Sequence, residues 1–258
     1  MSHRPQILIS NDDSIQAAGI EALARVAANF GDVTVVAPNA GQSGMGHAIS
    51  LGKPLRLYPA PHFGGGIKAY SCNGTPADCV KLATGVLLHR NPDLVLSGIN
   101  HGANSSASAI YSGTLAAARE AAIQGVAAVG FSLLNHAHSA DMTAAARVAE
   151  VIIAAVLKNK LAAGQLLSVN IPDIPYEDMK GFRITRQASG RWVEEFDERI
   201  DPYGQPYYWL TGKFLLQDDS EETDEHALRN GYVSISPMMH DLTEHSRIAE
   251  YSRWQLSL

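Results

Sequence analysis

The feature that most constrains the fold is an alternation of short β-branched apolar runs with longer periodic segments rich in alanine and leucine. It extends from the N-terminus to about residue 175. Short unbroken apolar runs predict strands that are buried on both faces, and the helical segments between them predict crossover connections. The alternation therefore predicts an α/β protein with a mostly parallel sheet that is flanked by helices.

The individual elements follow from hydrophobic periodicity and from turn residues. The expected strands cover residues 6–10, 33–37, 68–72, 93–97, 126–131 and 166–171, and the expected helices cover residues 20–30, 76–89, 113–124 and 141–163. Apolar residues recur at three- and four-residue spacing along the first helix. Thr75 followed by Pro76 predicts a helix start with a threonine N-cap and a proline in the first helical position.

The composition changes after residue 175, which divides the chain into an α/β core over 1–175 and a second segment over 176–258. Residues 183–217 are aromatic and turn-rich and predict a β-hairpin excursion, while an apolar strand over 232–236 precedes an extended, irregular tail. Six of the eight residues in 218–225 are acidic, and this run predicts a solvated loop rather than a metal site. Dense aromatic residues are enriched at protein contacts, so we expect the hairpin to pair with another subunit.

Net charge, cysteine content and the lack of long apolar runs indicate which binding partners and which cellular compartment to expect. A net charge of −6 gives no cationic field for duplex nucleic acid. Cys72 and Cys79 have neither zinc-site nor disulfide-framework spacing, so we expect two buried thiols. The N-terminus shows no export signal, and no apolar run reaches the ~18–20 residues needed to cross a bilayer. The sequence thus predicts a cytoplasmic protein with no membrane contact.

Polar residues gather where the expected strands end. Asp12 and Asp13 follow the first strand, Ser43 lies in a glycine-rich loop after the second strand with His47 just beyond it, and Asn100 follows the 93–97 strand. In an open parallel sheet, ligands bind outside the carboxyl ends of the strands, so these loops can converge on one crevice. A set of carboxylate, hydroxyl and amide oxygens suits a hard divalent cation such as Mg²⁺, Mn²⁺ or Ca²⁺.

Each of these motifs also has an ordinary structural explanation. The Asn-Asp-Asp-Ser segment over 11–14 could be an Asx turn and helix cap, and Ser43 a plain loop serine. His47 could be a surface or hydrogen-bonded histidine, and Asn100 an asparagine that tolerates the left-handed conformation. The coincidence of three such motifs at strand ends is what favours a cation site.

A candidate anion site lies next along the chain. Ser112, Gly113 and Thr114 open a helix, whose free N–H groups and partial positive charge attract phosphate. Ser112 or Thr114 could instead serve only as an N-cap. A cation crevice beside such a helix start suggests phosphoester hydrolysis. If the phosphate needs the space at position 113, Gly113→Val should damage catalysis and leave metal binding intact.

Motifs of other enzyme classes are missing. No G-x-G-x-x-G follows the first strand, the two Gly-Lys pairs lack the rest of a P-loop, and the loop around Ser43 lacks the last glycine of a serine-hydrolase elbow. These absences disfavour a dehydrogenase, an NTPase and an esterase.

Five ordered motifs resemble those of the SurE (survival protein E) nucleotidases. The resemblance extends from about residue 6 to residue 243, and its motifs read ILISNDDSIQAAGIEAL, APNAGQSGMGHAISL, CNGTPADCVKLA, SGINHGANSSASAIYSGTLAAAREAA and TDEHALRNGYVSISPMMHDLT.

The resemblance implies a Rossmann-like core and a metal-dependent phosphatase that acts on nucleoside 5′- or 3′-monophosphates. It implies one divalent cation per subunit, Mg²⁺ or Mn²⁺ with Ca²⁺ able to replace it in crystals, and a homodimer or homotetramer joined through the C-terminal part. The matching positions give expected cation ligands Asp12, Asp13, Ser43 and Asn100, a catalytic set of Asp12, Asp13, Asn100 and His47, and a phosphate lining of Asn104, Ser112, Gly113 and Thr114.

Two positions depart from the pattern of that family. Ser14 stands where a glycine usually follows the paired aspartates, and residues 105–108 read Ser-Ser-Ala-Ser where a Gly-Asp is usual. Only glycine is indifferent to a positive φ, so Ser14 could shift the aspartates slightly. Ser14 is also the feature that favours an alternative function: a nucleotide- or metal-binding regulatory protein with the same pocket and little turnover.

Overall fold

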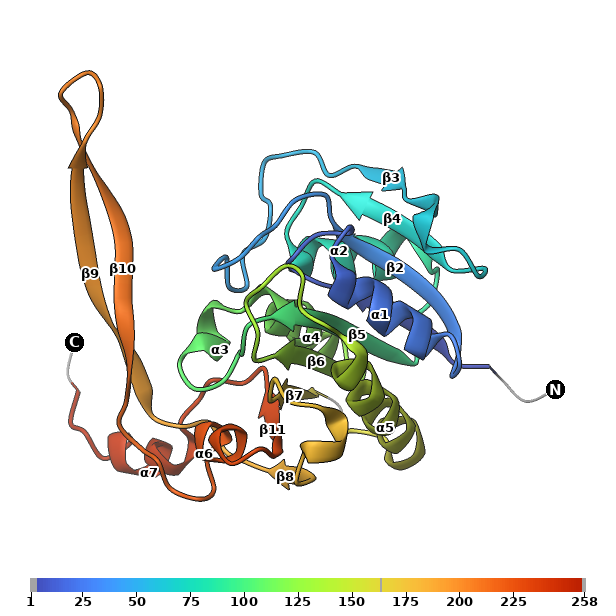
Figure 1. Cartoon of the computed structure of the whole chain (residues 1–258). Helices are drawn as coiled ribbons and strands as arrows, with labels where there is room; N and C mark the ends of the chain where they lie inside the picture. Colours follow the sequence, from blue (N-terminus) through green and yellow to red (C-terminus); the bar gives the residue numbers. More distant parts are fainter. Residues whose placement is uncertain (1–3, 163, 257–258) are drawn as a thin grey trace.

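A nine-stranded, mostly parallel sheet forms the centre of the molecule (Figure 1). The computed structural model describes residues 4–162 and 164–256. Along the sheet the order is β3-β4-β2-β1-β5-β6-β7-β11-β8, in which the β3–β4 and β7–β11 pairs are antiparallel and the other neighbours are parallel. The strands are β1 (Gln6–Ser10), β2 (Asp32–Pro38), β3 (Leu57–Pro59), β4 (Lys68–Cys72), β5 (Leu94–His101), β6 (Ala128–Leu133), β7 (Gln165–Ile171), β8 (Phe182–Ile184) and β11 (Val233–Met239).

The direction of winding reverses at β1. From β1 the chain adds β2 and then β4 on one side, and it returns to add β5, β6 and β7 on the other side. β1 and β5 are therefore neighbours, and Ser10 at the end of β1 pairs with Ser97 in β5. Such a switch point leaves a crevice outside the carboxyl ends of the two strands, because their connections leave in opposite directions.

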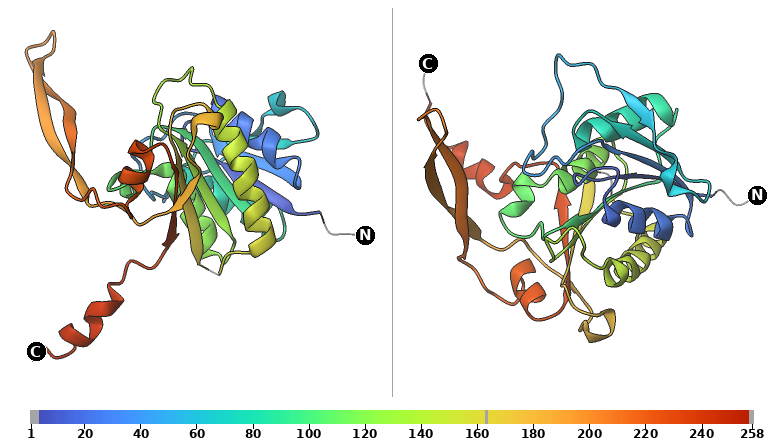
Figure 2. Two further views of the ribbon diagram at one scale, coloured as in Figure 1. Left: turned by 60° about the horizontal axis from the view of Figure 1, so that its bottom comes forward. Right: turned by 45° about the horizontal axis from the view of Figure 1, so that its top comes forward.

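Helices cover both faces of the sheet (Figure 2). α1 (Ala18–Ala27) packs beside α5 (Thr143–Asn159), and α2 (Pro76–Leu82) packs beside α4 (Gly113–Ile123). Alternate residues of β1 enter two separate cores: Ile7 and Ile9 join the α1 and α5 side chains, while Leu8 joins those of α2 and α4. The predicted α/β class with helices flanking a mostly parallel sheet is confirmed.

Local signals place helix starts better than helix ends. Thr75 caps α2 through a capping box with Asp78, and Pro76 occupies the first helical position as predicted. The α-helix nevertheless ends at Leu82 and continues as a π-helical turn over Ala83–Leu87, short of the predicted end at 89. α5 ends at Asn159, where the next residue takes a φ of 58°; residue 163, its predicted end, lies outside the described residues.

The predicted hairpin is formed by β9 (Gly190–Ile200) and β10 (Pro206–Leu216), which pair only with each other within the described residues. Both figures show it extending away from the sheet, and most of its side chains are exposed. Asp201 closes its turn, because its Oδ1 accepts hydrogen bonds from the backbone N–H groups of Tyr203 and Gln205.

The remaining C-terminal elements return partly to the sheet. α6 (Asp224–Arg229) leads into β11, so the sheet continues across the predicted boundary at residue 175. The tail that was expected to be irregular carries the short helix α7 (Ile248–Tyr251), and α3 (Ser108–Tyr111) precedes α4. Short 3₁₀ turns lie at Pro61–Phe63, Tyr176–Asp178 and His245–Arg247. Across 4–162 and 164–256, no helix is long and apolar enough to cross a membrane.

We predict that Gly19→Ala destabilises the fold by about 1–3 kcal/mol or more, the usual range for overpacking. A Cβ at position 19 would lie 1.9 Å from the carbonyl oxygen of Ile99, so α1 would have to move off β5. Gly85→Ala is the matched control, because a Cβ there meets open space. Urea unfolding should show a lower midpoint for Gly19→Ala alone, and equal midpoints would contradict this packing.

Candidate active site

A cleft of about 250 Å³ lies at the switch point of the sheet. Its walls come from the loop after β1, the glycine-rich loop after β2, the end of β5, the start of α4 and the base of the hairpin. The residues that line it are Asp12, Ser43, Gly44, Asn100, His101, Gly102, Ala103, Asn104, Ser108, Tyr111, Ser112, His136 and Trp192. Three of the four expected cation ligands are thus brought together in one cleft.

Asp12 lies between the cleft and the first turn of α4. Its carboxyl accepts a 2.5 Å hydrogen bond from the Thr114 hydroxyl, and only 4% of the residue is exposed. Burial raises the pKa of Asp12 from 3.8 to about 6; the Thr114 hydrogen bond opposes this rise, and the charge of Asp13 adds to it. A cation beside Asp12 would favour the ionised carboxylate that burial disfavours.

Asp13 contacts the cleft indirectly. Its Oδ2 accepts a 3.1 Å hydrogen bond from the backbone N–H of His101 and lies 3.1 Å from the His101 Nδ1. Asp13 is not among the lining residues, whereas His101 is. The Nε2 atom of His101 is buried and has no hydrogen-bond partner among the described residues. Asp13 therefore fixes the orientation of a histidine ring at the cleft and keeps its Oδ1 for another contact.

Asn100 and Ser43 complete the expected cation site. The Asn100 amide nitrogen donates to the carbonyl oxygens of His101 and Gly102, at 3.2 and 2.7 Å, so the amide oxygen is the atom left to face a ligand. The loop of Ser43 is tied to the first motif, because the Gln42 N–H donates to the Asp12 carbonyl oxygen at 2.7 Å.

The donor set fits a hard cation. Two carboxylates, one amide oxygen and one hydroxyl are oxygen ligands, which Mg²⁺ and Mn²⁺ prefer. Within the part of the chain that the structure describes, no group of three or more histidine, cysteine, aspartate or glutamate side chains could hold a metal ion.

The residues expected to line the phosphate divide into two groups. Asn104 and Ser112 line the cleft; Asn104 is held by Ser132 and Asn170, each at 2.8 Å, and the Ser112 hydroxyl caps α4. Gly113 and Thr114 instead contact Asp12. The Thr114 hydroxyl was expected to serve the phosphate, but it donates to the Asp12 carboxyl.

His47 is not brought to the cleft. Its Nε2 lies 3.1 Å from a carboxylate oxygen of Glu120, which also contacts Lys81 at 2.7 Å and Gln124 at 3.0 Å. Burial alone would raise the pKa of Glu120, but these hydrogen bonds and the Lys81 charge outweigh it and lower the pKa to about 2. The catalytic role of His47 stays a prediction, and its observed contacts connect the second motif to α4.

His136 and Trp192 are among the cleft residues that the sequence analysis did not predict. His136 follows β6, so the rule that polar residues at strand ends approach a ligand applies to it as well. A Cβ at Gly102 would lie 2.3 Å from the His136 ring, which shows how closely the ring packs on that backbone. Trp192 comes from the hairpin, and no sequence rule places a hairpin side chain at a distant strand end.

The fold and the cleft define an α/β protein with a cleft of oxygen-bearing side chains at the switch point of its sheet, beside a helix start. Residues 7–194 match the family described as Survival protein SurE, and the chain belongs to the SurE family.

Relatives match over almost the whole chain. The "5'-nucleotidase SurE" of Christiangramia forsetii is 50% identical over 260 residues, with 98% of each chain covered. The protein of the same description from Cytophaga hutchinsonii is 51% identical over 97% of this chain and 96% of its own. The crystal structure of the SurE protein from Aquifex aeolicus superposes with a TM-score of 0.82 at 37% identity, covering 95% of this chain and 98% of that one.

We predict that Gly113→Ala weakens Mn²⁺ binding by about 10–100-fold, the usual effect of disturbing a residue that supports a metal ligand. A Cβ at position 113 would lie 2.7 Å from the Asp12 Cβ and 2.9 Å from its Oδ2, so the carboxylate would have to move. The sequence argument expected metal binding to survive a larger residue here, and this contact reverses that expectation.

Gly41→Ala serves as the control for Gly113→Ala, because a Cβ at Gly41 meets nothing within 4 Å. Calorimetric titration with Mn²⁺ measures both variants. Equal Mn²⁺ affinities for Gly113→Ala and the wild type would show that the position of the Asp12 carboxylate does not depend on a glycine at 113.

We predict that Ser14→Gly raises the free energy of unfolding by about 0.5–1 kcal/mol. Ser14 has a φ of 98°. A left-handed backbone destabilises the folded state of an L-residue by roughly 1–2 kcal/mol. Replacement by glycine removes this cost but adds roughly 0.5–1 kcal/mol of conformational entropy to the unfolded state, which opposes the gain. Ser139→Gly is the control, because Ser139 is exposed and does not have a positive φ. Chemical denaturation should show a higher free energy of unfolding for Ser14→Gly and no increase for the control. A lower free energy of unfolding for both variants would contradict backbone strain at Ser14.

Proposed function

We propose that this chain is a metal-dependent nucleotidase that hydrolyses nucleoside 5′-monophosphates, and also 3′-monophosphates, to nucleoside and phosphate. One observation carries the proposal: Asp12 lies in the cleft and also contacts the first turn of α4. A cation on Asp12 and a phosphate at the helix start would then be neighbours, as phosphoester hydrolysis requires. The relatives described as 5'-nucleotidases are 50% and 51% identical in sequence to this chain, and they support the same activity.

In this mechanism the residues of the chain hold the cation and orient the phosphate. Asp12, Asn100 and Ser43, with Asp13 beside them, would hold one Mg²⁺ or Mn²⁺ per subunit, which supplies Lewis-acid stabilisation of the developing charge. The start of α4 and the Asn104 side chain would orient the phosphate oxygens. A water oxygen would bond to phosphorus as the bond from phosphorus to the ribose oxygen breaks, and a proton of that water would pass to the ribose oxygen of the leaving nucleoside.

The alternative of a regulatory protein with little turnover is not favoured. Its only sequence argument was Ser14, and the paired aspartates keep their contacts with Thr114 and His101 despite the positive φ of Ser14. The relatives that cover nearly the whole chain are named as nucleotidases.

We also propose a homodimer or homotetramer in which the segment over 176–258 joins subunits, and a location in the cytoplasm. The oligomer proposal is supported by the hairpin, whose exposed apolar residues include Phe196, Ile200, Trp209 and Leu210, each at least 57% exposed. Such exposed apolar surface on an extended hairpin is typical of a protein contact.

We predict that Asp12→Asn lowers kcat on AMP by about 100-fold or more with saturating Mn²⁺, on the scale of losing a group that stabilises transition-state charge. Asp32→Asn is the control, because Asp32 is an exposed carboxylate at the start of β2, paired with Arg4. Chelation with EDTA should abolish phosphate release, and added Mg²⁺ or Mn²⁺ should restore it. Wild-type turnover by Asp12→Asn, or full activity in EDTA, would reject the proposed site.

A further inference from the structure

We infer that the apolar cavity at the base of the hairpin is a stacking subsite for the nucleobase of the substrate, an inference that rests on the proposed nucleotidase function. The cavity has a volume of about 600 Å³ and is lined by Gly44, Tyr111, Trp192, Glu194, Leu210, Thr211 and Gly212. It adjoins the catalytic cleft, because Gly44, Tyr111 and Trp192 line both spaces.

The two spaces together match the polarity of a mononucleotide. The cleft holds Asp12, Asn100 and the start of α4, which suit a phosphate with a cation. The adjoining cavity is mainly apolar, with two aromatic side chains, Trp192 and Tyr111, that are about half exposed. Aromatic rings stack on bases of any sequence, so a phosphate in the cleft would place its base among them.

The hairpin leaves a hollow beside Trp192. Along β9 and β10, Trp192 pairs with Phe214 and Glu194 pairs with Gly212, so a position without a side chain faces the carboxylate. The Trp192 and Phe214 rings meet edge to face, with centroids 5.7 Å apart. Phe214 thereby holds the indole ring in place, and Gly212 lines the cavity beside it.

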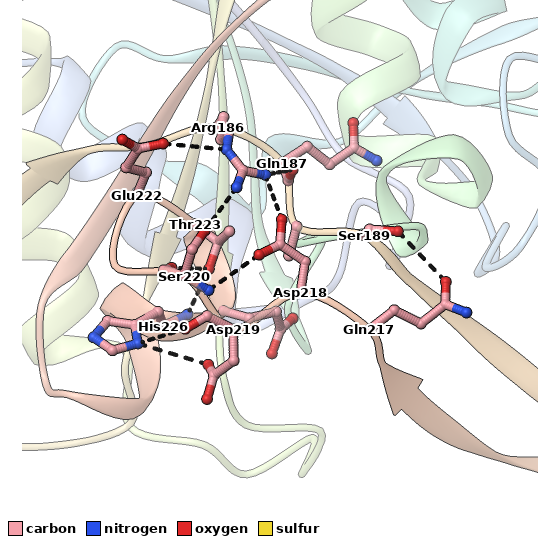
Figure 3. A network of polar contacts seen from close by, with 12 residues as sticks. Arg186, Gln187, Ser189, Gln217, Asp218, Asp219, Ser220, Glu222, Thr223 and His226 are labelled. Carbon is pink, nitrogen blue, oxygen red and sulfur yellow. Dashed lines mark hydrogen bonds and ion pairs between the residues drawn. The ribbon is translucent and has the colours of Figure 1, made fainter.

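The base of the hairpin is anchored where its two ends meet, which fixes Trp192 relative to the cleft. Figure 3 shows Arg186, before β9, reaching Asp218, Ser220 and Glu222, which follow β10; the Arg186–Asp218 distance is 2.7 Å. The same figure shows Ser189 and Gln217 in contact across the two ends. An ordered platform loses less entropy on binding a ligand.

A second anchor connects the hairpin to the catalytic loops. The buried Asp224 carboxylate accepts from the backbone N–H of Ala188 and from that of Ser106, each at 2.9 Å. The Ser106 hydroxyl donates to the Ala188 carbonyl oxygen at 3.0 Å. The loop that carries Asn104 and the strand that carries Trp192 are thus joined, and the phosphate and base positions have a fixed separation.

The test compares AMP with ribose 5-phosphate, which has the same ester and lacks the base. Trp192→Ala should raise KM for AMP by about 5–100-fold, the range for losing one stacking ring, and should change KM for ribose 5-phosphate by a clearly smaller factor. Trp192→Phe should restore most of the affinity. Tyr58→Ala is the control, because Tyr58 is a half-exposed aromatic residue of β3 that lines neither the cleft nor the cavity.

Equilibrium binding separates this inference from the proposed activity. Calorimetric titration of EDTA-treated protein should show tighter binding of AMP than of ribose 5-phosphate, and Trp192→Ala should remove the difference. If the wild type shows this difference but hydrolyses neither ester with Mn²⁺, the subsite stands and the nucleotidase proposal fails. If both esters are hydrolysed and Trp192→Ala lowers both equally or neither, the subsite is wrong and the activity stands. A Trp192→Ala chain that changes oligomeric state but not AMP affinity would assign the cavity to a second copy of the chain.

Discussion

The contact between Asp12 and the first turn of α4 is the interaction on which the cleft depends. A buried carboxylate needs a hydrogen-bond partner, and the Thr114 hydroxyl supplies one to Asp12. The Asp12 side chain fits against the helix because residue 113 is a glycine and has no side chain. The contact joins the end of β1 to the helix that packs over β5 and β6. The contact therefore fixes the proposed cation ligand relative to the helix start that is proposed to bind the phosphate.

The α/β core was predictable because the winding of a parallel sheet follows from buried strands and helical crossovers. The strands β1, β4 and β7 differ from their predicted bounds by at most one residue. β5 was predicted to end at 97, but it continues to His101 through an irregularity after Ser97, so Asn100 is a strand residue and does not follow the strand. Three-residue strands such as β3 and β8 carry too little pattern to be predicted and depend on neighbours already in the sheet.

The site was predictable where it is built from strand ends and unpredictable where it depends on long-range contacts. Asp12, Ser43 and Asn100 meet because the chain reverses its winding between β1 and β5. The pairing of His47 with Glu120 joins residues 73 positions apart, and a lone histidine gives no signal of such a partner. Trp192 lies at the cleft because polar contacts hold the base of the hairpin. Such contacts between distant residues leave no periodic pattern in the sequence, so they could not be predicted from it.

The serine-rich segment after Asn104 is held in place by carboxylates of the acidic segment over 218–225. Where the family usually has a Gly-Asp, this chain has no carboxylate of its own, yet Ser105 donates to Glu225 at 2.5 Å and the Ser106 N–H donates to Asp224. The run over 218–225 was expected to be a solvated loop, and its first residues are mostly exposed, but Asp224 is buried at the start of α6. A buried carboxylate without hydrogen bonds would be costly, so the backbone N–H groups that it binds must stay in place. Because these belong to the Asn104 loop and to the hairpin, the acidic residues constrain the two parts of the chain that would hold the phosphate and the base.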